Sequence, residues 1–445
     1  MRALYTLAWY LLLPLLPLRL WWRGRKEPGY RQHVGERFGR YRGPAPQPIV
    51  WVHAVSLGET RAAAPLIDRL TRAHPAATVL LTHMTATGRA AGRELFGDRV
   101  VQAWLPYDVP FAVHAFLRHF RPRAGMLVET ELWPNLVACS TAAGVPLFLV
   151  NARLSERSAA GYARIGRLAR PMLASLAGIA AQTGAHAARF AALGAPAPVV
   201  TGNLKFDLEV PATALALGRE LRRRFGALRP VWVAASTRDG EEALILDALA
   251  ARPLPPGTLT VVVPRHPQRF DAVAALLRER GIAFARRSDD LPVPADARVV
   301  LGDSMGEMLG YCAAADVVFV GGSLLPLGGQ NLIEPIAVGR PTLVGPHMFN
   351  FAEATADALA AGAARRVDDA ATLIEEVGAL LAAPARCAAM GEAALAFHAA
   401  HRGAVERLWQ WLAPQLDAAL APGAGPPRAG GGGGGGSGVS PSTGG

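Results

Sequence analysis

A glutamate at a predicted turn is the first residue with a possible chemical role. Glu59 follows the apolar run IVWVHA, which begins at Ile49, and precedes the helical segment TRAAAPLIDRL. A carboxylate at a turn from strand to helix can face a substrate and act as a general base. Ser56 and Glu59 also have the spacing of a capping box, in which the glutamate only satisfies backbone donors. The spacing alone favours the capping role.

Two more carboxylates and a lysine occupy similar places in the first half. Glu129 and Glu131 follow the apolar run that begins at Gly125 and could bind a metal or stabilise positive charge in a transition state. Side-chain alternation would put both on one side if the strand extends that far, but both could also be solvated in a loop. Lys205, in TGNLKFD, could neutralise a phosphate or a carboxylate, or could simply be exposed.

The second half of the chain is richer in groups that bind anions. Residues 235–240, ASTRDG, follow a predicted strand and offer hydroxyl and amide groups to a phosphate. Arg265, in PRHP from Pro264, could pair with a phosphate or carboxylate through two hydrogen bonds. We expect His266 to form hydrogen bonds rather than bind a metal, because no second His or Cys stands at ligand spacing.

Two later loops lead into predicted helices. Ser304 and Glu307, in DSMGEM, have the spacing of a capping box. The glycine-rich segment 321–335, GGSLLPLGGQNLIEP, leads into a helix expected to begin near Asn331. Amides at that start would favour a phosphate, and Glu334 could accept hydrogen bonds from ribose hydroxyls. The alternative is an Asn cap with Glu334 as its partner.

The sequence lacks the motifs of several enzyme classes. The absence of a Walker A motif and of G-x-G-x-x-G after the first strand argues against an NTPase or a dehydrogenase. Cys139, Cys312 and Cys387 lie far apart, so neither a disulfide framework nor a zinc site is predicted. The D-x-D spacing of many metal-dependent glycosyltransferases is also missing, which favours a metal-free transferase.

The candidate residues need elements that bring them together. Short apolar runs alternate with longer helical segments, which is typical of parallel-sheet α/β domains that bind ligands at the carboxyl ends of their strands. The predicted fold class is α/β, with two doubly wound, Rossmann-like domains facing across a cleft. The expected strands begin at Ile49, Thr78, Gly125, Pro146 and Gly178 in the first half, and at Val231, Leu259, Arg298, Val317 and Pro341 in the second.

The N-terminus carries a segment that favours membranes. Residues 3–18 are apolar but fall short of the roughly 20 residues that a perpendicular spanning helix needs. Pro14 and Pro17 would weaken a soluble core helix but are tolerated in membrane helices, so we expect an uncleaved anchor rather than an ordinary buried helix. The arginine-rich stretch that follows places this end on the cytoplasmic side.

The formal net charge is +11, so the surface should attract anions such as nucleotide phosphates, lipid head groups or nucleic acid. The basic residues crowd beside the anchor without a recognition motif, and we therefore expect no nucleic-acid partner.

The motifs HAVSLGE, ETELWPN, TGNLKFD, PRHP, DSMGEM and GGQNLIEP together resemble, in order, those of the lipid A 3-deoxy-D-manno-octulosonic acid (Kdo) transferases. The resemblance runs from about Tyr5 to Trp411. It implies a GT-B fold at the cytoplasmic side of the inner membrane, with CMP-Kdo as donor, lipid IVA as acceptor and no cofactor. The reaction would be an inverting transfer in lipopolysaccharide inner-core biosynthesis. A GT-B transferase that uses a UDP-sugar and a lipid acceptor is the alternative.

The resemblance also implies roles for single residues. Glu59 falls on the general base, while Glu129 and Lys205 take roles in stabilising the transition state. Arg238 and Gln330 stand where histidine is expected in many relatives. The implied CMP site consists of Pro264, Arg265, Gly306, Glu307, Met308, Asn331, Leu332, Ile333 and Glu334.

With these roles the chain divides into six predicted segments. They are a membrane anchor (1–22), a basic juxtamembrane segment (23–46), an acceptor-binding domain (47–210), a linker (211–229), a CMP-sugar-binding domain (230–420) and a disordered glycine-rich tail (421–445).

Overall fold

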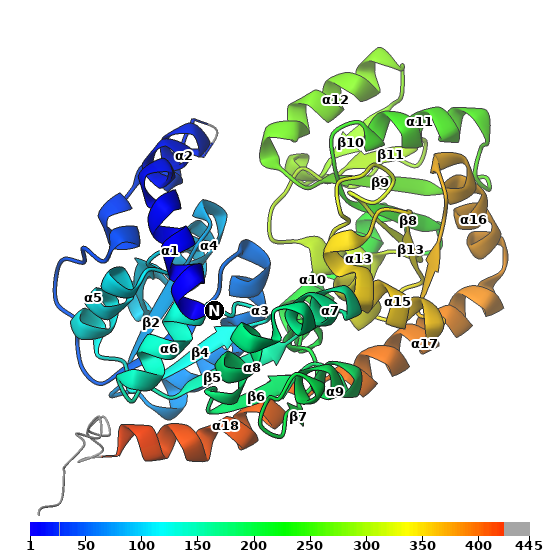
Figure 1. The fold of residues 1–445 in the computed structure, drawn as a ribbon. Helices are drawn as coiled ribbons and strands as arrows, with labels where there is room; N and C mark the ends of the chain where they lie inside the picture. Colours follow the sequence, from blue (N-terminus) through cyan, green and yellow to red (C-terminus); the bar gives the residue numbers. More distant parts are fainter. Residues whose placement is uncertain (26, 422–445) are drawn as a thin grey trace, which may run out of the picture. The chain divides into compact units, whose positions relative to one another are not determined.

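The computed structural model describes residues 1–25 and 27–421, and these form two compact α/β units (Figure 1). Unit 1 consists of Met1–Lys205 together with the chain from Gly403 onward, and unit 2 consists of Phe206–Arg402. Except for Ala421, the predicted disordered tail lies outside the described residues.

Unit 1 is built on a parallel sheet of seven strands in the order β3-β2-β1-β4-β5-β6-β7. Every residue of the central strands β1, β4 and β5 is buried, as expected for a parallel sheet covered on both faces. The strands are β1 (Ile49–His53), β2 (Thr78–His83), β3 (Val101–Trp104), β4 (Ala124–Val128), β5 (Leu147–Ala152), β6 (Gly178–Ala181) and β7 (Val199–Val200).

The helices of unit 1 cover both faces of this sheet. Along β1, Trp51 packs into one apolar core with Phe116 of α5, whereas Val52 packs into a second core with Leu66 of α3. The helices are α1 (Arg2–Leu12), η1 (Leu13–Leu15), α2 (Leu16–Arg23), η2 (Pro28–Arg31), η3 (Val34–Phe38), α3 (Leu57–Ala73), α4 (Ala86–Phe96), η4 (Gly97–Arg99), α5 (Pro110–Phe120), α6 (Pro134–Ala142), α7 (Glu156–Arg164), α8 (Gly166–Ala174), α9 (Gly184–Ala192), η5 (Leu204–Phe206) and α18 (Ala404–Leu420).

Unit 2 repeats this plan with strand order β10-β11-β9-β8-β12-β13-β14, all parallel. Its strands are β8 (Val231–Thr237), β9 (Leu259–Pro264), β10 (Phe284–Arg286), β11 (Val299–Leu301), β12 (Val317–Val320), β13 (Thr342–Val344) and β14 (Ala364–Arg366). Its helices are α10 (Ala212–Phe225), α11 (Glu241–Ala251), η6 (Pro267–Arg269), α12 (Phe270–Glu279), η7 (Arg287–Asp289), α13 (Met308–Ala314), α14 (Ile333–Ala337), η8 (Phe349–Phe351), α15 (Ala352–Ala360), α16 (Ala370–Ala382) and α17 (Pro384–His401).

All the strands expected from the sequence are present, and the four that were not expected are the edge strands β3, β7, β10 and β14. Edge strands are buried less completely, so they need no continuous apolar run. Val200 of β7, for example, is exposed, and β14 ends in two exposed arginines.

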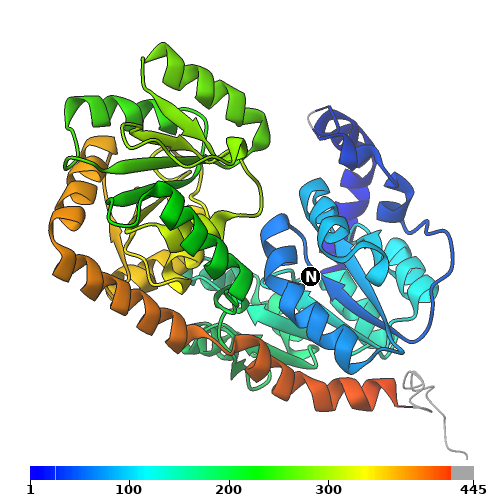
Figure 2. The same ribbon diagram turned by 180° about the vertical axis from the view of Figure 1, so that it is seen from behind.

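The observed boundaries differ from the predicted domains in two places. Most of the expected linker, 211–229, is the helix α10, whose Leu221 and Phe225 are buried in the core of unit 2. The last helix, α18, belongs to unit 1 because Leu408 and Leu412 are buried against the core on the α3 face (Figure 2). Chain order alone had assigned this helix to the C-terminal domain.

The apolar N-terminus is helical from Arg2 to Arg23, and by length and hydropathy it could cross a membrane or anchor to one. Pro14 lies in the 3-10 turn η1 between α1 and α2, since proline lacks the N–H that a continuous helix needs. Leu16 and Leu20 of α2 are buried against Tyr30 and Tyr107, so one side of this segment packs on unit 1.

Candidate active site

Glu59 lies in the first turn of α3, directly after the carboxyl end of β1. The Ser56 hydroxyl accepts a hydrogen bond from the Glu59 N–H and donates one to the Glu59 carboxylate at 3.1 Å. The other carboxylate oxygen accepts the N–H of Val55 at 2.5 Å, one residue before the position that a capping box uses. Glu59 therefore does contribute to capping, and this contact also fixes its carboxylate at the sheet edge.

The surroundings of Glu59 suit a general base. Burial and the negative charges of Glu129 and Glu131 together raise the pKa of Glu59 to about 7, although the hydrogen bonds from Val55 and Ser56 act in the opposite direction. A group with a pKa near the working pH is ionised often enough to take a proton and basic enough to hold it. Capping and catalysis are thus compatible in this carboxylate.

Glu129 does not continue the strand, contrary to the expectation that alternation would place it beside Glu131. β4 ends at Val128, and Glu129 has a left-handed backbone with φ of 64°. Its carboxylate instead faces Lys205, with Nζ 2.9 Å from Oε1. Such a backbone is strained in a residue with a side chain, and strain of this kind often occurs at functional sites. The fold thus joins two of the predicted catalytic residues as an ion pair.

Lys205 is positioned by a residue that the sequence analysis missed. Asn151, near the end of β5, has φ of 50° and accepts the N–H of Leu204 through Oδ1 at 3.0 Å. The side chain of Gln182, which follows the neighbouring strand β6, donates to the carbonyl of Asn151. This hydrogen bond fixes the backbone at Asn151. The only sequence signal was a polar residue at the end of an apolar run.

Glu131 lies close enough to Glu59 for its charge to raise the pKa of Glu59. It accepts a hydrogen bond from the indole N–H of Trp133 at 3.0 Å. Burial raises the pKa of Glu131 itself, and the charge of Glu129 adds to this effect. Unit 1 therefore gathers Glu59, Glu129, Glu131 and Lys205 at the carboxyl edge of its sheet.

In unit 2, Pro264 ends β9 and Arg265 follows it at the carboxyl edge of the second sheet. The Arg265 N–H donates to the carbonyl of Thr237 at 3.0 Å. Burial lowers the pKa of His266, as do the charges of Arg238 and Arg265, so this histidine is neutral at pH 7. That state suits the hydrogen-bonding role expected for it.

Residues 306–308 follow β11, the neighbour of β9. The expected capping box at Ser304 is wrong, because α13 begins at Met308 and Glu307 is its N-cap. The Ser304 hydroxyl donates to the Glu307 carboxylate at 2.6 Å, and Arg287 pairs with that carboxylate at 3.0 Å. Gly306 has φ of 78° and open space where a side chain would stand, which leaves the backbone accessible to a ligand.

The glycine-rich loop follows β12 and leads into α14, which begins at Ile333 and is only five residues long. The N-cap residue is Leu332, which contributes no side-chain cap, and Asn331 before it accepts the Ile333 N–H through Oδ1 at 3.1 Å. Leu332 and Ile333 are fully buried in the core, so their side chains cannot line a ligand site, whereas Glu334 is half-buried. A helix this short also has a smaller dipole than the sequence led us to expect.

A buried carboxylate that the sequence analysis missed holds the two anion-binding loops of unit 2 together. Glu241, at the start of α11, accepts the N–H groups of Arg238, Gly322, Ser323 and Leu324 at 2.6–2.9 Å. These amides are therefore not available to a phosphate. In the sequence, the only indication of this role was the position of Glu241 in the first turn of a helix.

Arg238 and Gln330, which stand where histidine is expected in many relatives, lie beside Gly322 of the glycine-rich loop. A side chain added at Gly322 would meet Gln330 at 3.2 Å and Arg238 at 3.4 Å. Both side chains therefore flank the carboxyl end of β12.

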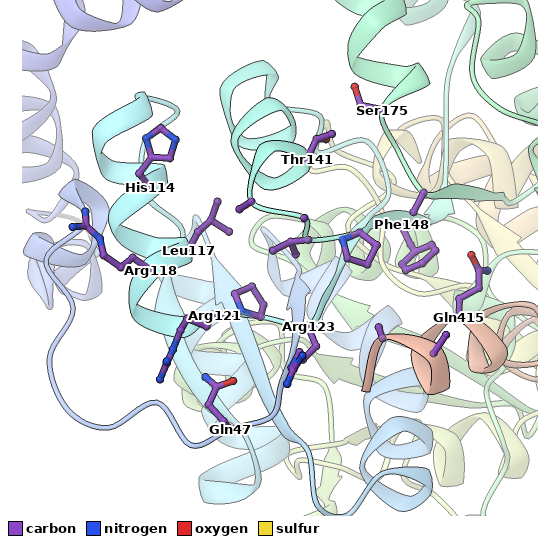
Figure 3. A pocket seen from close by; sticks show the side chains of 18 residues that line it. Gln47, His114, Leu117, Arg118, Arg121, Arg123, Thr141, Phe148, Ser175 and Gln415 are labelled. Atoms are coloured by element: carbon purple, nitrogen blue, oxygen red, sulfur yellow. The ribbon is translucent and has the colours of Figure 1, made fainter. Parts of the chain in front are cut away.

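A large cavity of about 1060 Å³ lies at the opposite, amino edge of the unit 1 sheet (Figure 3). Its lining includes Gln47, Arg123 and Pro146, each close before a strand, with Arg118 and Arg121 from the end of α5. None of the predicted site residues lines it, so the candidate active site is the carboxyl edge. No group of three or more His, Cys, Asp or Glu side chains suited to a metal occurs among the described residues.

Residues 32–208 match the family described as 3-deoxy-D-manno-octulosonic-acid transferase (kdotransferase). The 3-deoxy-D-manno-octulosonic acid transferase of Bordetella pertussis is 49% identical over 430 residues, which cover 92% of this chain and 99% of that protein. The chain belongs to this family of transferases. The Kdo transferase of Haemophilus influenzae is 37% identical over 425 residues, covering 94% of this chain and 99% of its own.

Solved structures support the fold class. The UDP-GlcNAc 2-epimerase of Neisseria meningitidis has a TM-score of 0.53 at 15% identity, covering 82% of this chain and all of that one. Together with the two doubly wound sheets, this likeness confirms the expected GT-B class. As a member of the Kdo transferase family, the chain is a glycosyltransferase.

Proposed function

We propose that this chain transfers Kdo from CMP-Kdo to lipid IVA in lipopolysaccharide inner-core biosynthesis, with inversion at the anomeric carbon and without a metal. The observation that carries the proposal is the arrangement of Glu59, with a pKa of about 7, beside the Glu129–Lys205 pair in a member of this family. Unit 1 would bind the acceptor, and unit 2 would bind the donor.

Glu59 would take the proton from the attacking sugar hydroxyl of the acceptor. The Kdo–phosphate bond of the donor breaks as the new glycosidic bond forms, so positive charge develops on the sugar and negative charge on the departing CMP. The carboxylates of Glu129 and Glu131 would stabilise the positive charge, while Lys205 would stabilise the negative charge. Attack on the face opposite the leaving CMP gives inversion.

The donor site would consist of groups that follow three parallel strands of the unit 2 sheet. Arg265 follows β9, Gly306 follows β11, and Asn331 and Glu334 follow β12. Arg265 can pair with the CMP phosphate, the open backbone at Gly306 allows close approach, and Glu334 can accept hydrogen bonds from ribose hydroxyls. Leu332 and Ile333 would support this site from the core.

The N-terminal helices would hold unit 1 at the cytoplasmic side of the inner membrane. Along this segment the side that faces away from unit 1 is apolar, with Leu4, Leu11 and Leu18 all more than half exposed. Because Leu16 and Leu20 pack on unit 1, the docked segment would lie in the interface rather than cross the bilayer. Arg19 and Arg23 would attract anionic lipid heads.

Mass spectrometry of the product formed from purified protein, CMP-Kdo and lipid IVA tests this function directly. We expect the acceptor mass to increase by one or more Kdo units, with equal transfer in EDTA. Release of UDP from a UDP-sugar, without CMP release from CMP-Kdo, would favour the alternative transferase. Loss of activity in EDTA that returns with Mg²⁺ would contradict the metal-free mechanism.

A further inference from the structure

The N-terminal helix is hydrogen-bonded to the region that carries the candidate site. α1 lies beside α6 (Figure 1). The Tyr5 hydroxyl donates to Asp108 Oδ2 at 2.8 Å, and the Thr6 hydroxyl donates to Asn135 Oδ1 at 2.9 Å. A helix that served only as a membrane tether would need no such polar contacts with unit 1.

Asp108 is the centre of this network and is almost completely buried. Its carboxylate accepts the N–H of Leu136 at 2.7 Å and that of Asn135 at 3.0 Å, while its carbonyl accepts the Asn135 amide at 2.8 Å. These N–H groups lie in the first turn of α6, which begins at Pro134 without a side-chain cap of its own. Asp108 therefore caps α6 from another segment. The Tyr5 hydroxyl donates a further hydrogen bond to the Asp108 carboxylate.

The start of α6 is hydrogen-bonded to Glu131 of the candidate site. Trp133 is the N-cap of α6 and donates its indole N–H to Glu131 at 3.0 Å. The ring of Trp9, from α1, packs on the ring of Trp133 with centroids 6.2 Å apart. A shift of α1 or of the α6 turn would thus move Glu131, which lies near Glu59.

We propose that Asp108 is a positioning residue through which the docked helix α1 holds Trp133 and Glu131 beside the general base. The inference rests on the proposed function. Docking of α1 is then required for full transfer activity and not only for membrane attachment. The two roles use different sides of one helix, since Tyr5 and Thr6 face unit 1 while Leu4 and Leu11 are exposed.

The substitution Tyr5→Phe tests this role because it removes one hydroxyl and keeps the ring. Tyr10→Phe is the matched control, since Tyr10 lies on the same helix, is exposed and stacks on Phe111 outside the Asp108 network. We expect kcat for lipid IVA in detergent to fall about tenfold in Tyr5→Phe, as for loss of a hydrogen bond to a charged group. Binding to vesicles of phosphatidylethanolamine and phosphatidylglycerol should be unchanged in both variants.

The pH profile distinguishes positioning from mere stability. The charges of Glu129 and Glu131 raise the pKa of Glu59, while Val55 and Ser56 lower it by hydrogen bonding, and Glu129 is itself paired with Lys205. If Tyr5→Phe displaces Glu131, the acidic limb of kcat/KM should move to lower pH, whereas a loss of stability alone would leave it in place.

An unchanged kcat in Tyr5→Phe, or a lower kcat with an unmoved acidic limb, would overturn the inference. Asp108→Asn should move the limb in the same direction, because an amide cannot accept at both positions. No transfer by the wild-type chain would overturn the proposed function, and this inference with it. Activity in the wild type and in Tyr10→Phe therefore separates the two failures.

Discussion

At the scale of single residues, the helix cap and the candidate base are the same carboxylate. The contacts with Val55 and Ser56 hold Glu59 in one orientation, and burial together with two neighbouring glutamates keeps its pKa near 7. A base that is already fixed in place needs no reordering when substrate arrives. The local and the catalytic interpretations of its position are therefore complementary.

Glu59→Gln should abolish transfer and keep the fold. Loss of a general base typically costs about 10²- to 10⁴-fold in rate. The folded-state pKa is raised from 4.5, so ionisation of Glu59 reduces stability as pH rises toward 7, and the neutral variant should be at least as stable at pH 8. Calorimetry and product assays check this, with the exposed Glu406→Gln as control. Wild-type turnover in Glu59→Gln would return Glu59 to capping alone.

Protonation of Glu59 should limit the reaction in acid. Because its pKa is about 7, kcat/KM should fall about tenfold for each pH unit below that value. Initial rates of CMP release across the acidic and neutral range measure this limb. A flat profile through pH 7 would exclude Glu59 as the titrating base.

At the scale of elements, two loops of unit 2 are held in place by the buried carboxylate of Glu241. Glu241 accepts four backbone N–H groups from two loops, so it holds the turn after β8 against the glycine-rich turn after β12. The positions of Arg238 and Gln330 beside Gly322 follow from this connection.

Glu241→Gln should loosen both loops. Glutamine keeps one acceptor oxygen, so some buried N–H groups lose their partner at a cost of about 1–3 kcal/mol each. We expect a lower melting temperature and a KM for CMP-Kdo that rises more than kcat falls. Glu375→Gln, whose carboxylate is exposed and paired with Arg252, is the control. Equal melting temperatures for the two variants would refute this role.

At the scale of the whole molecule, the end of the chain completes the unit in which the chain begins. α18 buries Leu408, Leu412 and Leu416 in the core that also contains Leu66 of α3. Arg69 of α3 lies 3.8 Å from Glu406 at the edge of this contact. Unit 1 therefore depends on residues that follow all of unit 2.

Two truncations test this dependence. Ending the chain at Arg402 removes three buried leucines and should destabilise unit 1 by about 4.5–9 kcal/mol, at roughly 1.5–3 kcal/mol for each side chain. Ending it at Ala421 should leave the melting temperature and activity unchanged. A chain ending at Arg402 that still melts like the full protein would show that unit 1 folds without α18.

The amino-acid sequence by itself determined the interior of both sheets and the strand ends that precede Glu59 and Arg265. A strand buried on both faces needs a continuous apolar run, and ligand-binding loops of such sheets lie at the carboxyl ends. Edge strands escaped prediction because they need no such run. Family membership likewise followed from motifs that are local in the sequence.

Only the tertiary structure decided which of these residues act together. It paired Glu129 with Lys205, gave Glu59 its high pKa, placed Asp108 beneath α6 and returned α18 to unit 1. Each of these depends on through-space distance and burial between segments far apart in the chain. Local periodicity and spacing carry no record of such distances, so charge and packing at the site become visible only once the chain has folded.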